Sequence, residues 1–392
     1  MASSSTVRMK VLAVLNSLAP GGTEQSTVVL AHGLQALGIE TTIVTMKRAD
    51  HELDGIAEAG GTRVVRLRSG SAVAQLRELR HLIRSERPDV VHTALFEADQ
   101  LGRLAAIGTR TPVISSMVNT PYDAARLLDP NVRRWKLRAV QVVDAITGRF
   151  FVSRFHAVSE GVKRANARAL HLDPQRVTVA ERGRDTTALG TRSEERTSAV
   201  RASLGVDVGA PVVLSLGRQE HQKAHVDLLA AAVLLRTRVP NLVVLIAGKD
   251  GSATREINER LADDAELASV VRILGHRTDV GDLLSAADAL AISSHFEGTA
   301  GVALEAMAVG TPIVSTDLSG LVGVLEADRN AVLVAAANPE ALATGLERVL
   351  TDDGLAARIA ARAQADFHAR FTLSAATDRM RDLYESVSAR SR

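Results

Sequence analysis

The sequence predicts an α/β protein of two doubly wound domains, each with a parallel sheet between two layers of helices. Short apolar runs alternate with helical patterns along most of the 392 residues, which is the order expected for parallel sheets. A polar segment with little regular pattern, 181–196, interrupts this alternation, and 392 residues exceed what one core usually supports. We therefore expect one domain over 1–190 and another over 191–370, with a C-terminal helix, 371–392, returning to the first.

The strands are placed from the apolar runs. The expected strands of the first domain are 10–15, 41–46, 62–67, 89–92, 112–116 and 155–159. Those of the second domain are 211–216, 242–247, 270–274, 289–293 and 311–315. In open parallel sheets ligands bind beyond the carboxyl ends of the strands, so the residues that follow each strand carry the functional information.

Composition narrows the classes of function. An apolar fraction of 46% with 23% charged residues is typical of a soluble globular protein, and 3% aromatic residues argue against a base-stacking surface for nucleic acid. The net charge of +2 is not informative, and no basic tail or stripe indicates nucleic-acid binding. The absence of cysteine excludes disulfides, thiol catalysis and cysteine metal sites, and the histidines show no ligand spacing, so we expect no metal site. The polar start and the short first apolar run predict neither a signal peptide nor a membrane span, hence a cytoplasmic protein.

The segment 293–312 contains two carboxylates in an informative setting. Glu297 lies on the loop after an expected strand, and Glu305 lies on the short helix that follows. Three small residues, 299–301, fall at the N-terminus of that helix, where unpaired backbone N–H groups and the helix dipole favour an anion such as a diphosphate. Each carboxylate can accept hydrogen bonds from neighbouring sugar hydroxyls, whereas the alternative is a pair of solvated surface glutamates.

Two other strand ends carry candidate ligand-binding residues. Arg218 and Lys223 follow the strand 211–216 and can neutralise a leaving diphosphate, although two solvated surface cations are the alternative. Gly21 and Gly22 follow the first strand and let the backbone approach a ligand closely. The spacing of a dinucleotide fingerprint is absent there, so a plain tight turn remains the alternative for the glycine pair.

Taken together, these motifs resemble the family 4 retaining glycosyltransferases of the GT-B fold nearly end to end. The matching segments are 21–24, 89–92, 157–162, 217–223, 274–277 and 297–305. The resemblance implies two facing Rossmann-like domains with a cleft between them. It also implies transfer of a sugar from a nucleoside-diphosphate sugar to a hydroxyl acceptor, with retained anomeric configuration, no metal and no cofactor. UDP or GDP is the expected nucleotide.

The resemblance also assigns roles to residues. Arg218 and Lys223 would hold the diphosphate and Glu297 the transferred sugar, and these three are the expected catalytic residues. Glu305 would bind the ribose. The expected donor-binding residues are Gly21, Gly22, Gly217, Gly275, His276, Arg277, Thr299, Ala300, Gly301 and Glu305.

The chain departs from the family pattern at three points. Many members carry a functional histidine after the strand 112–116, where this chain has Asn119, which can bind a sugar hydroxyl but cannot act as a base. His92 or backbone groups would take that role, or the role is dispensable, and a core histidine is an equal alternative for His92. With Tyr122, these two residues are the acceptor-side candidates. The segment 181–185 lacks the usual asparagine before glycine, and 299–301 lacks the usual Phe-Gly pair, which leaves the preferred sugar open.

The acceptor is the least defined part of the prediction. A polysaccharide, a lipid-linked molecule or a natural product each fits the resemblance. Arginines and a lysine surround Trp135, which indicates either a weak peripheral contact with the inner membrane surface or simply a solvated helix. Two alternatives to a transferase stay open: a catalytically silent sugar-nucleotide-binding or scaffold protein, and a nucleotide-sugar epimerase.

Overall fold

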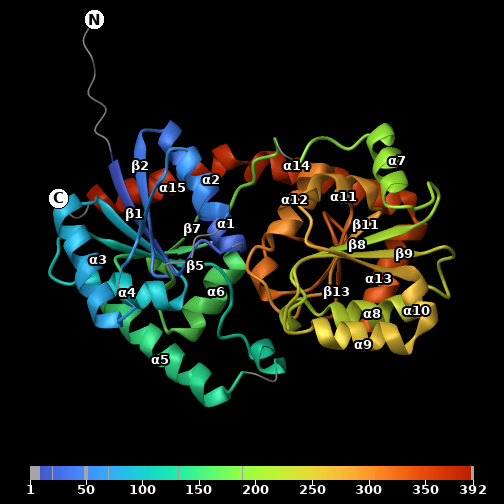
Figure 1. Cartoon of the computed structure of the whole chain (residues 1–392), viewed down its shortest axis with the longest axis horizontal. Coiled ribbons are helices and arrows are strands. Elements are labelled where there is room, and N and C mark those ends of the chain that lie inside the picture. Colours follow the sequence, from blue (N-terminus) through green and yellow to red (C-terminus); the bar gives the residue numbers. More distant parts are fainter. Residues whose placement is uncertain are drawn as a thin grey trace, which may run out of the picture. The chain divides into compact units, whose positions relative to one another are not determined.

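The computed structural model describes residues 9–389 except 20, 48–51, 69, 130–131 and 188. Its described residues form two compact units (Figure 1). Unit 1 comprises 9–122, 132–183 and 373–389, and unit 2 comprises 123–129 and 184–372. This division differs from the sequence-based one for 123–129, 184–190 and 371–372, which belong to unit 2.

Unit 1 is built on a seven-stranded sheet whose strands are all parallel. Its spatial order is β3-β2-β1-β4-β5-β6-β7. The strands are β1 (Met9–Leu15), β2 (Ile39–Thr45), β3 (Arg63–Arg66), β4 (Val90–Ala94), β5 (Val113–Met117), β6 (Arg154–Ala157) and β7 (Val177–Val179). The chain starts at the centre, runs outward through β2 and β3, and returns to β4 beside β1. The carboxyl ends of β1 and β4 therefore flank a topological switch point.

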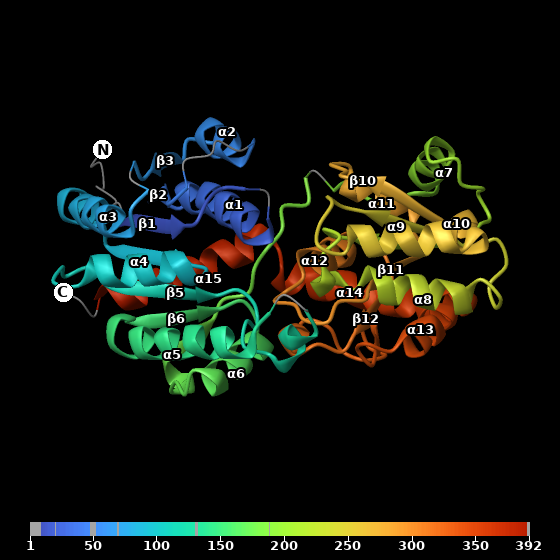
Figure 2. The same cartoon turned by 60° about the horizontal axis from the view of Figure 1, so that its bottom comes forward.

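Helices cover both faces of this sheet (Figure 2). They are α1 (Gly22–Ala36), α2 (Glu52–Ala59), α3 (Ala72–Glu86), α4 (Phe96–Ala106), α5 (Arg134–Phe151), α6 (Glu160–Ala169) and α15 (Leu373–Ser388). One apolar cluster joins α3 and α4 to the sheet, and others join α1, α2 and α15 to it. The last helix thus returns to unit 1, where Met380, Leu383 and Tyr384 pack against α1, β1 and β4.

Unit 2 repeats the plan with a six-stranded parallel sheet. Its spatial order is β10-β9-β8-β11-β12-β13. The strands are β8 (Val212–Leu216), β9 (Val243–Ala247), β10 (Val271–Gly275), β11 (Ala289–Ile292), β12 (Ile313–Thr316) and β13 (Val332–Val334). Every residue of the central strands β8, β9 and β11 is buried, as expected for parallel strands covered on both faces. The switch point of this sheet lies between β8 and β11.

Eight helices are described in unit 2, and two apolar clusters place them on opposite faces. The helices are α7 (Glu194–Ser203), α8 (His225–Leu235), α9 (Thr254–Asp263), α10 (Ala265–Val270), α11 (Val280–Ala286), α12 (Gly301–Val309), α13 (Pro339–Thr351) and α14 (Asp353–Arg370). One cluster joins α8, α9, α10 and α13 to the sheet. The other joins α11, α12 and the end of α14. No helix in the described ranges is long and apolar enough to cross a membrane.

The α/β class and the two parallel sheets expected from the sequence are confirmed. Each predicted strand has its counterpart within two residues at either end. Two strands were not predicted, β7 and β13, and both are three-residue strands at a sheet edge. Short edge strands carry too few residues to produce a readable apolar run.

Candidate functional site

The candidate site of unit 2 lies at its switch point, where two loops follow neighbouring strands. The first loop follows β8 and contains Gly217, Arg218 and the short 3-10 helix His221–Lys223. The second follows β11 and runs from Ser293 to α12. Gly217 has φ +155°, and a Cβ on Gly248 would lie 1.8 Å from the Gly217 carbonyl oxygen. The strand ends thus approach so closely that only glycine fits at 248.

Lys223 and Glu297 meet across these two loops. The Lys223 Nζ donates to Glu297 Oε1 over 2.5 Å, and the Ser294 hydroxyl donates to the same oxygen over 2.8 Å. Glu297 is buried and Lys223 is half-buried, so the pair is partly shielded from solvent. Both contacts use Oε1, which leaves the lone pairs of Oε2 for another donor such as a sugar hydroxyl.

Hydrogen bonds to backbone carbonyls hold the two loops in place relative to each other. The Gln222 side-chain amide donates to the Phe296 carbonyl over 2.9 Å, and the His295 amide donates to the Gln222 carbonyl over 2.9 Å. The Ser293 hydroxyl donates to the Lys223 carbonyl over 2.8 Å. These bonds fix the backbones that carry Lys223 and Glu297, so the geometry of the pair does not depend on the ion pair alone.

Arg218 occupies a different position from Lys223. Its side chain is 59% exposed, and its guanidinium lies 3.3 Å from Glu220 Oε1. Hydrogen bonds from Ser252 lower the pKa of Glu220 below its ordinary value, so that carboxylate stays charged beside Arg218. Among the described residues Arg218 touches neither Lys223 nor Glu297, and it is free to turn toward an anion.

Glu305 is held by an arginine that the sequence analysis did not single out. The Arg184 Nε donates to Glu305 Oε1 over 2.9 Å, and both side chains are largely buried. Arg184 also lies against the start of α12, because a Cβ on Gly301 would lie 2.0 Å from its Nη2. Ala300 precedes this helix with φ 45°, and no side chain caps the helix. The Ala303 N–H donates to the Ala300 carbonyl over 2.8 Å, and the positive end of the helix dipole at Gly301 favours an anion.

The expected donor-binding residues Gly275, His276 and Arg277 lie at the end of the edge strand β10 and directly after it. Gly275 has φ +65°, and its carbonyl accepts from the Gly248 amide over 2.7 Å, which ties this turn to the loop after β9. His276 is exposed. Arg277 forms a double contact with Asp279, at 2.8 and 2.5 Å, and this pairing raises the pKa of Arg277 and lowers that of Asp279.

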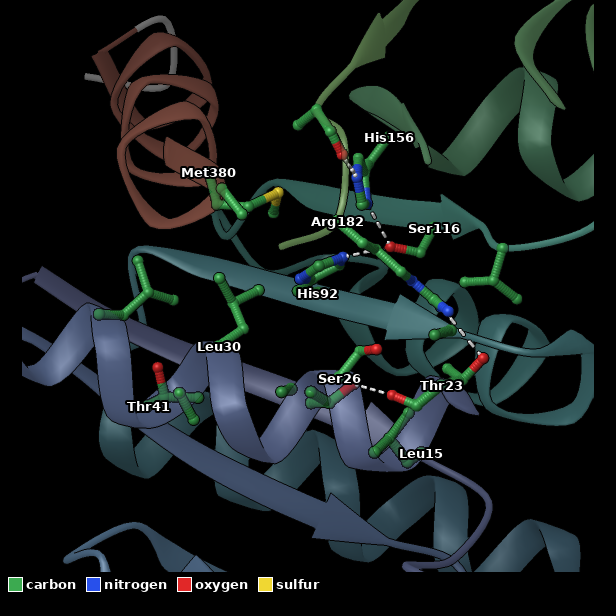
Figure 3. A pocket seen from close by; sticks show the side chains of 18 of the residues that line it. Leu15, Thr23, Ser26, Leu30, Thr41, His92, Ser116, His156, Arg182 and Met380 are labelled. Carbon is green, nitrogen blue, oxygen red and sulfur yellow. Dashed lines mark hydrogen bonds between the residues drawn. The ribbon is translucent and has the colours of Figure 1, made fainter. Parts of the chain in front are cut away.

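Unit 1 contains a pocket of about 60 Å³ between α1, α15 and the sheet, lined largely by apolar side chains (Figure 3). His92 of β4 lines it beside Ser116 of β5 and His156 of β6. Its Nε2 and the Nδ1 of His156 each lie 2.6 Å from the Ser116 hydroxyl, and its Nδ1 lies 2.7 Å from the Tyr384 hydroxyl. Burial lowers the pKa of His92 to about 3 and that of His156 to about 4, so both rings are neutral near pH 7.

The Ala180 carbonyl sets the direction of the hydrogen bonds in this row. It lies 2.8 Å from the Nε2 of His156 and can only accept, so that nitrogen carries the hydrogen and Nδ1 is an acceptor. Ser116 must then donate to His156 and accept from the Nε2 of His92. This leaves the Nδ1 of His92 to accept from Tyr384. His92 thus uses both nitrogens within unit 1.

The remaining expected site residues of unit 1 are Gly21, Gly22, Asn119 and Tyr122, and all except Gly22 lie outside helices and strands. Gly21, with φ −160°, precedes α1, and Gly22 begins that helix with open space at its Cβ position. The Asn119 carbonyl accepts from the Asn166 side chain over 2.9 Å, while the side-chain amide of Asn119 contacts none of the described residues. The Tyr122 hydroxyl donates to Asp144 Oδ2 over 2.6 Å.

The structure therefore brings some predicted residues together and keeps others apart. In unit 2, Lys223 joins Glu297, whereas Arg218, Glu305 and the turn 275–277 each have separate partners. Arg184 and Ser294 were missed. Ser294 immediately precedes the glutamate loop, which was a usable signal, but the pairing of Arg184 with Glu305 spans 121 residues and leaves no local pattern.

Two parallel-sheet units of this build define the GT-B class of glycosyltransferase folds. A model described as Glycosyltransferase Family 4 matches residues 20–188, and one described as Glycosyl transferases group 1 matches 197–366. The chain belongs to glycosyltransferase family 4.

Curated relatives and solved structures agree with this assignment. The D-inositol 3-phosphate glycosyltransferase of Corynebacterium urealyticum is 32% identical over 54% of this chain, and that of Xylanimonas cellulosilytica is 33% identical over 77%. The matched regions cover 51% and 73% of those proteins, so the chain spans only about half the length of the first. Anabaena HepE, solved with UDP-glucose, superposes with a TM-score of 0.83 at 22% identity over 96% of this chain and all of that one, which shows the shared fold.

Proposed function

We propose that this protein is a retaining, metal-independent glycosyltransferase that uses a nucleoside-diphosphate sugar. Unit 2 binds the donor, and unit 1 takes a hydroxyl acceptor. The observation that carries the proposal is the contact between Lys223 and Glu297 at the switch point of unit 2. A cation for phosphate and a carboxylate for sugar hydroxyls lie side by side where parallel sheets bind ligands.

Each donor-side residue has a role that fits its surroundings. Lys223 keeps ammonium hydrogens for a diphosphate oxygen while it donates one to Glu297. Arg218, exposed and loosely paired, turns to the same diphosphate. Glu297 accepts from the sugar through Oε2, and Glu305, oriented by Arg184, accepts from the ribose. The segment Thr299, Ala300 and Gly301 leads into the start of α12, where the helix dipole favours the negative charge of the diphosphate.

The reaction needs no nucleophile from the protein. The bond between the anomeric carbon and the leaving phosphate oxygen breaks, and a bond to the acceptor oxygen forms on the same face. The acceptor proton passes to the phosphate oxygen that has left. Negative charge on that oxygen grows in the transition state, so Lys223 and Arg218 stabilise the transition state more than the bound donor.

UDP-hexoses are the first donors to test, because HepE was solved with UDP-glucose. GDP- and ADP-sugars complete the screen. Polyol phosphates are the first acceptors, because two relatives are named D-inositol 3-phosphate glycosyltransferases. On the acceptor side, the side-chain amide of Asn119 can bind a hydroxyl group of the acceptor. Tyr122 positions its loop through the hydrogen bond to Asp144, and His92 forms part of the wall of the unit 1 pocket. Gly21 and Gly22, at the start of α1, let the backbone approach a ligand closely.

The test begins with thermal unfolding in the presence of each nucleotide and sugar nucleotide, since a ligand that binds only the folded state raises the melting temperature. Turnover with the stabilising donor then follows, with the anomeric configuration of the product read by NMR and a parallel reaction in chelator. Lys223→Ala should lower kcat roughly a hundredfold. Arg255→Ala, on the exposed surface of α9, is the matched control and should leave kcat unchanged.

Two results contradict the proposal. Melting temperatures that no sugar nucleotide changes would instead indicate a silent scaffold. Inverted product, or activity abolished by chelator, would remove the retaining and metal-independent parts of the assignment.

A further inference from the structure

Helix α5 of unit 1 exposes an apolar stripe to solvent. Trp135, Ile146 and Phe150 are 64%, 53% and 70% exposed, and Val142 and Val143 between them are exposed as well. At about 100° per residue these five side chains fall within an arc of about 100° on one side of the helix. That spacing is the one a helix normally buries.

The opposite side of α5 is the side that is packed. Its buried residues are Asp144 and Gly148. Asp144 Oδ1 lies 2.5 Å from the Nη1 of Arg103, whose side chain is only 2% exposed, and its Oδ2 accepts from Tyr122. Gly148 allows the helix to approach Phe155, whose ring carbon would lie 2.9 Å from a Cβ there. The helix is therefore inverted: it buries a carboxylate and exposes its large apolar residues.

This inversion is fixed by the buried contacts. Turning the apolar stripe inward would remove Asp144 from Arg103 and leave the buried guanidinium with only the more distant carboxylate of Asp99 among the described residues, at 3.9 Å. The stripe therefore stays exposed to solvent. Exposed apolar patches of this kind mark surfaces that bind another protein or a membrane.

Cations border the stripe on both sides. Arg138 and Arg149 lie along one edge, Arg134 lies beyond them, and Lys136 lies on the other edge; all four are exposed. The Lys136 ammonium lies 5.7 Å from the Trp135 ring centroid. Asp144 is the one acidic residue of the helix, and it points inward. Among the described residues none forms an ion pair with these four cations.

We propose that α5 is a docking surface for an anionic lipid bilayer, lying parallel to the membrane with Trp135, Ile146 and Phe150 in the interface. Apolar residues flanked by arginine and lysine, on a helix whose one acidic residue is buried, match a bilayer that offers acyl chains beneath negative headgroups. The long basic side chains can extend from the stripe to the headgroups. A second copy of the chain is a poorer partner, because a two-fold contact along α5 would set these cations against one another.

The test is flotation of the full chain with two kinds of vesicle, phosphatidylcholine alone and phosphatidylcholine with phosphatidylglycerol. We expect binding only to the anionic vesicles. The double variant Ile146→Asn, Phe150→Asn should reduce the partition coefficient roughly tenfold or more, because two apolar side chains no longer enter the interface. Arg138→Glu should reduce it roughly fivefold or more, and added salt should weaken wild-type binding.

Matched controls come from other helices of unit 1. Ile56→Asn changes an exposed apolar residue of α2, and Arg84→Glu reverses an exposed charge of α3. Both should bind as wild type, and unchanged melting temperatures should show that all variants are folded. No donor or acceptor is present, so the result is independent of the proposed transferase activity.

Three outcomes would overturn the proposal. Equal binding to both vesicle types excludes an anionic surface as the partner. Unchanged binding of the α5 variants places any membrane contact elsewhere. A dimer of the lipid-free protein, seen by light scattering and dispersed by the Ile146→Asn, Phe150→Asn variant, assigns the stripe to self-association.

Discussion

Lys223 and Glu297 lie 74 residues apart in the sequence, yet the ammonium of one contacts the carboxylate of the other at the switch point of unit 2. The two loops that carry these residues are also joined by hydrogen bonds that do not involve the ion pair, from the Gln222 and Ser293 side chains to backbone carbonyls. It can therefore be altered one side chain at a time without dismantling the site.

Replacing Lys223 by methionine, alone and together with Glu297→Gln, should show that the stability of the protein and its turnover depend on Lys223 for different reasons. Glu297, 6% exposed, would keep only Ser294 as a partner, and the free energy of unfolding should fall by about 2 kcal/mol. The loss should be smaller than for a fully buried pair, because the Lys223 side chain is 23% exposed. Adding Glu297→Gln should restore most of the stability but none of the turnover. Urea unfolding and kcat, measured on both variants, check this, and a double variant that regains turnover would contradict the proposed roles.

Gly301→Ala tests whether Arg184 orients Glu305 for the donor. The new Cβ would lie 2.0 Å from the Arg184 Nη2 and should push the guanidinium away from Glu305. We expect KM for the donor to rise roughly tenfold with a smaller change in kcat, because a ribose contact acts on the ground state as well as the transition state. Gly209→Ala, where nothing lies within 4 Å, is the control. An unchanged KM in Gly301→Ala would separate Arg184 from donor binding.

Gly320→Ala should displace the loop that carries Glu297. A Cβ at 320 would lie 1.8 Å from the Glu297 carbonyl oxygen, which is backbone and cannot turn aside. The loop must shift, and we expect the variant to lose about 2 kcal/mol of stability or more, together with most of its turnover. Calorimetry and initial rates measure both quantities. If the stability and the turnover of Gly320→Ala both equal those of the wild type, then the contact between Lys223 and Glu297 does not depend on the position of this loop.

Acidification should destabilise the protein through its buried neutral histidines. Burial lowers the pKa of His156 and of His225 from 6.5 to about 4. The unfolded chain therefore takes up protons below pH 6.5 that the folded chain refuses until about pH 4. Their stabilising effect is complete above pH 6.5 and is lost as the pH falls to about 4, at up to about 1.4 kcal/mol per pH unit for each ring.

Unfolding midpoints in urea across this pH range measure the effect. In His156→Gln, the free energy of unfolding should depend less steeply on pH, because one of the two buried imidazole rings is missing. His81→Gln, which alters an exposed histidine of α3, should leave the slope unchanged. A slope that is the same in His156→Gln and in the wild type would show that His156 binds its proton equally in both states.

The fold and the Lys223–Glu297 contact were predictable for the same reason. Central parallel strands are buried along their whole length and almost entirely apolar, and loops follow them directly, so reading past each strand end found Lys223 and Glu297. The three-residue strands β7 and β13 lack that signal. The pairing of Arg184 with Glu305 also lacks it, because it joins a residue outside the named strands to the middle of α12, 121 residues later.

Helix α5 shows a different limit of sequence reading. Its periodicity identifies an apolar side and a polar side, and the ordinary rule buries the apolar one. Asp144 faces inward because Arg103 of α4 and Tyr122 both bind its carboxylate. These partners lie 41 and 22 residues away in the sequence, so the pattern of α5 alone could not reveal them.

The row of hydrogen bonds that ends at the Ala180 carbonyl has a consequence for the pocket of unit 1. Tyr384 and Ser116 each spend their single hydroxyl hydrogen within the row, toward His92 and His156. Toward the pocket both oxygens can present only lone pairs. A molecule that enters must bring its own hydrogens to satisfy them, so this wall selects alcohols and amines over ethers and carbonyl compounds of the same shape.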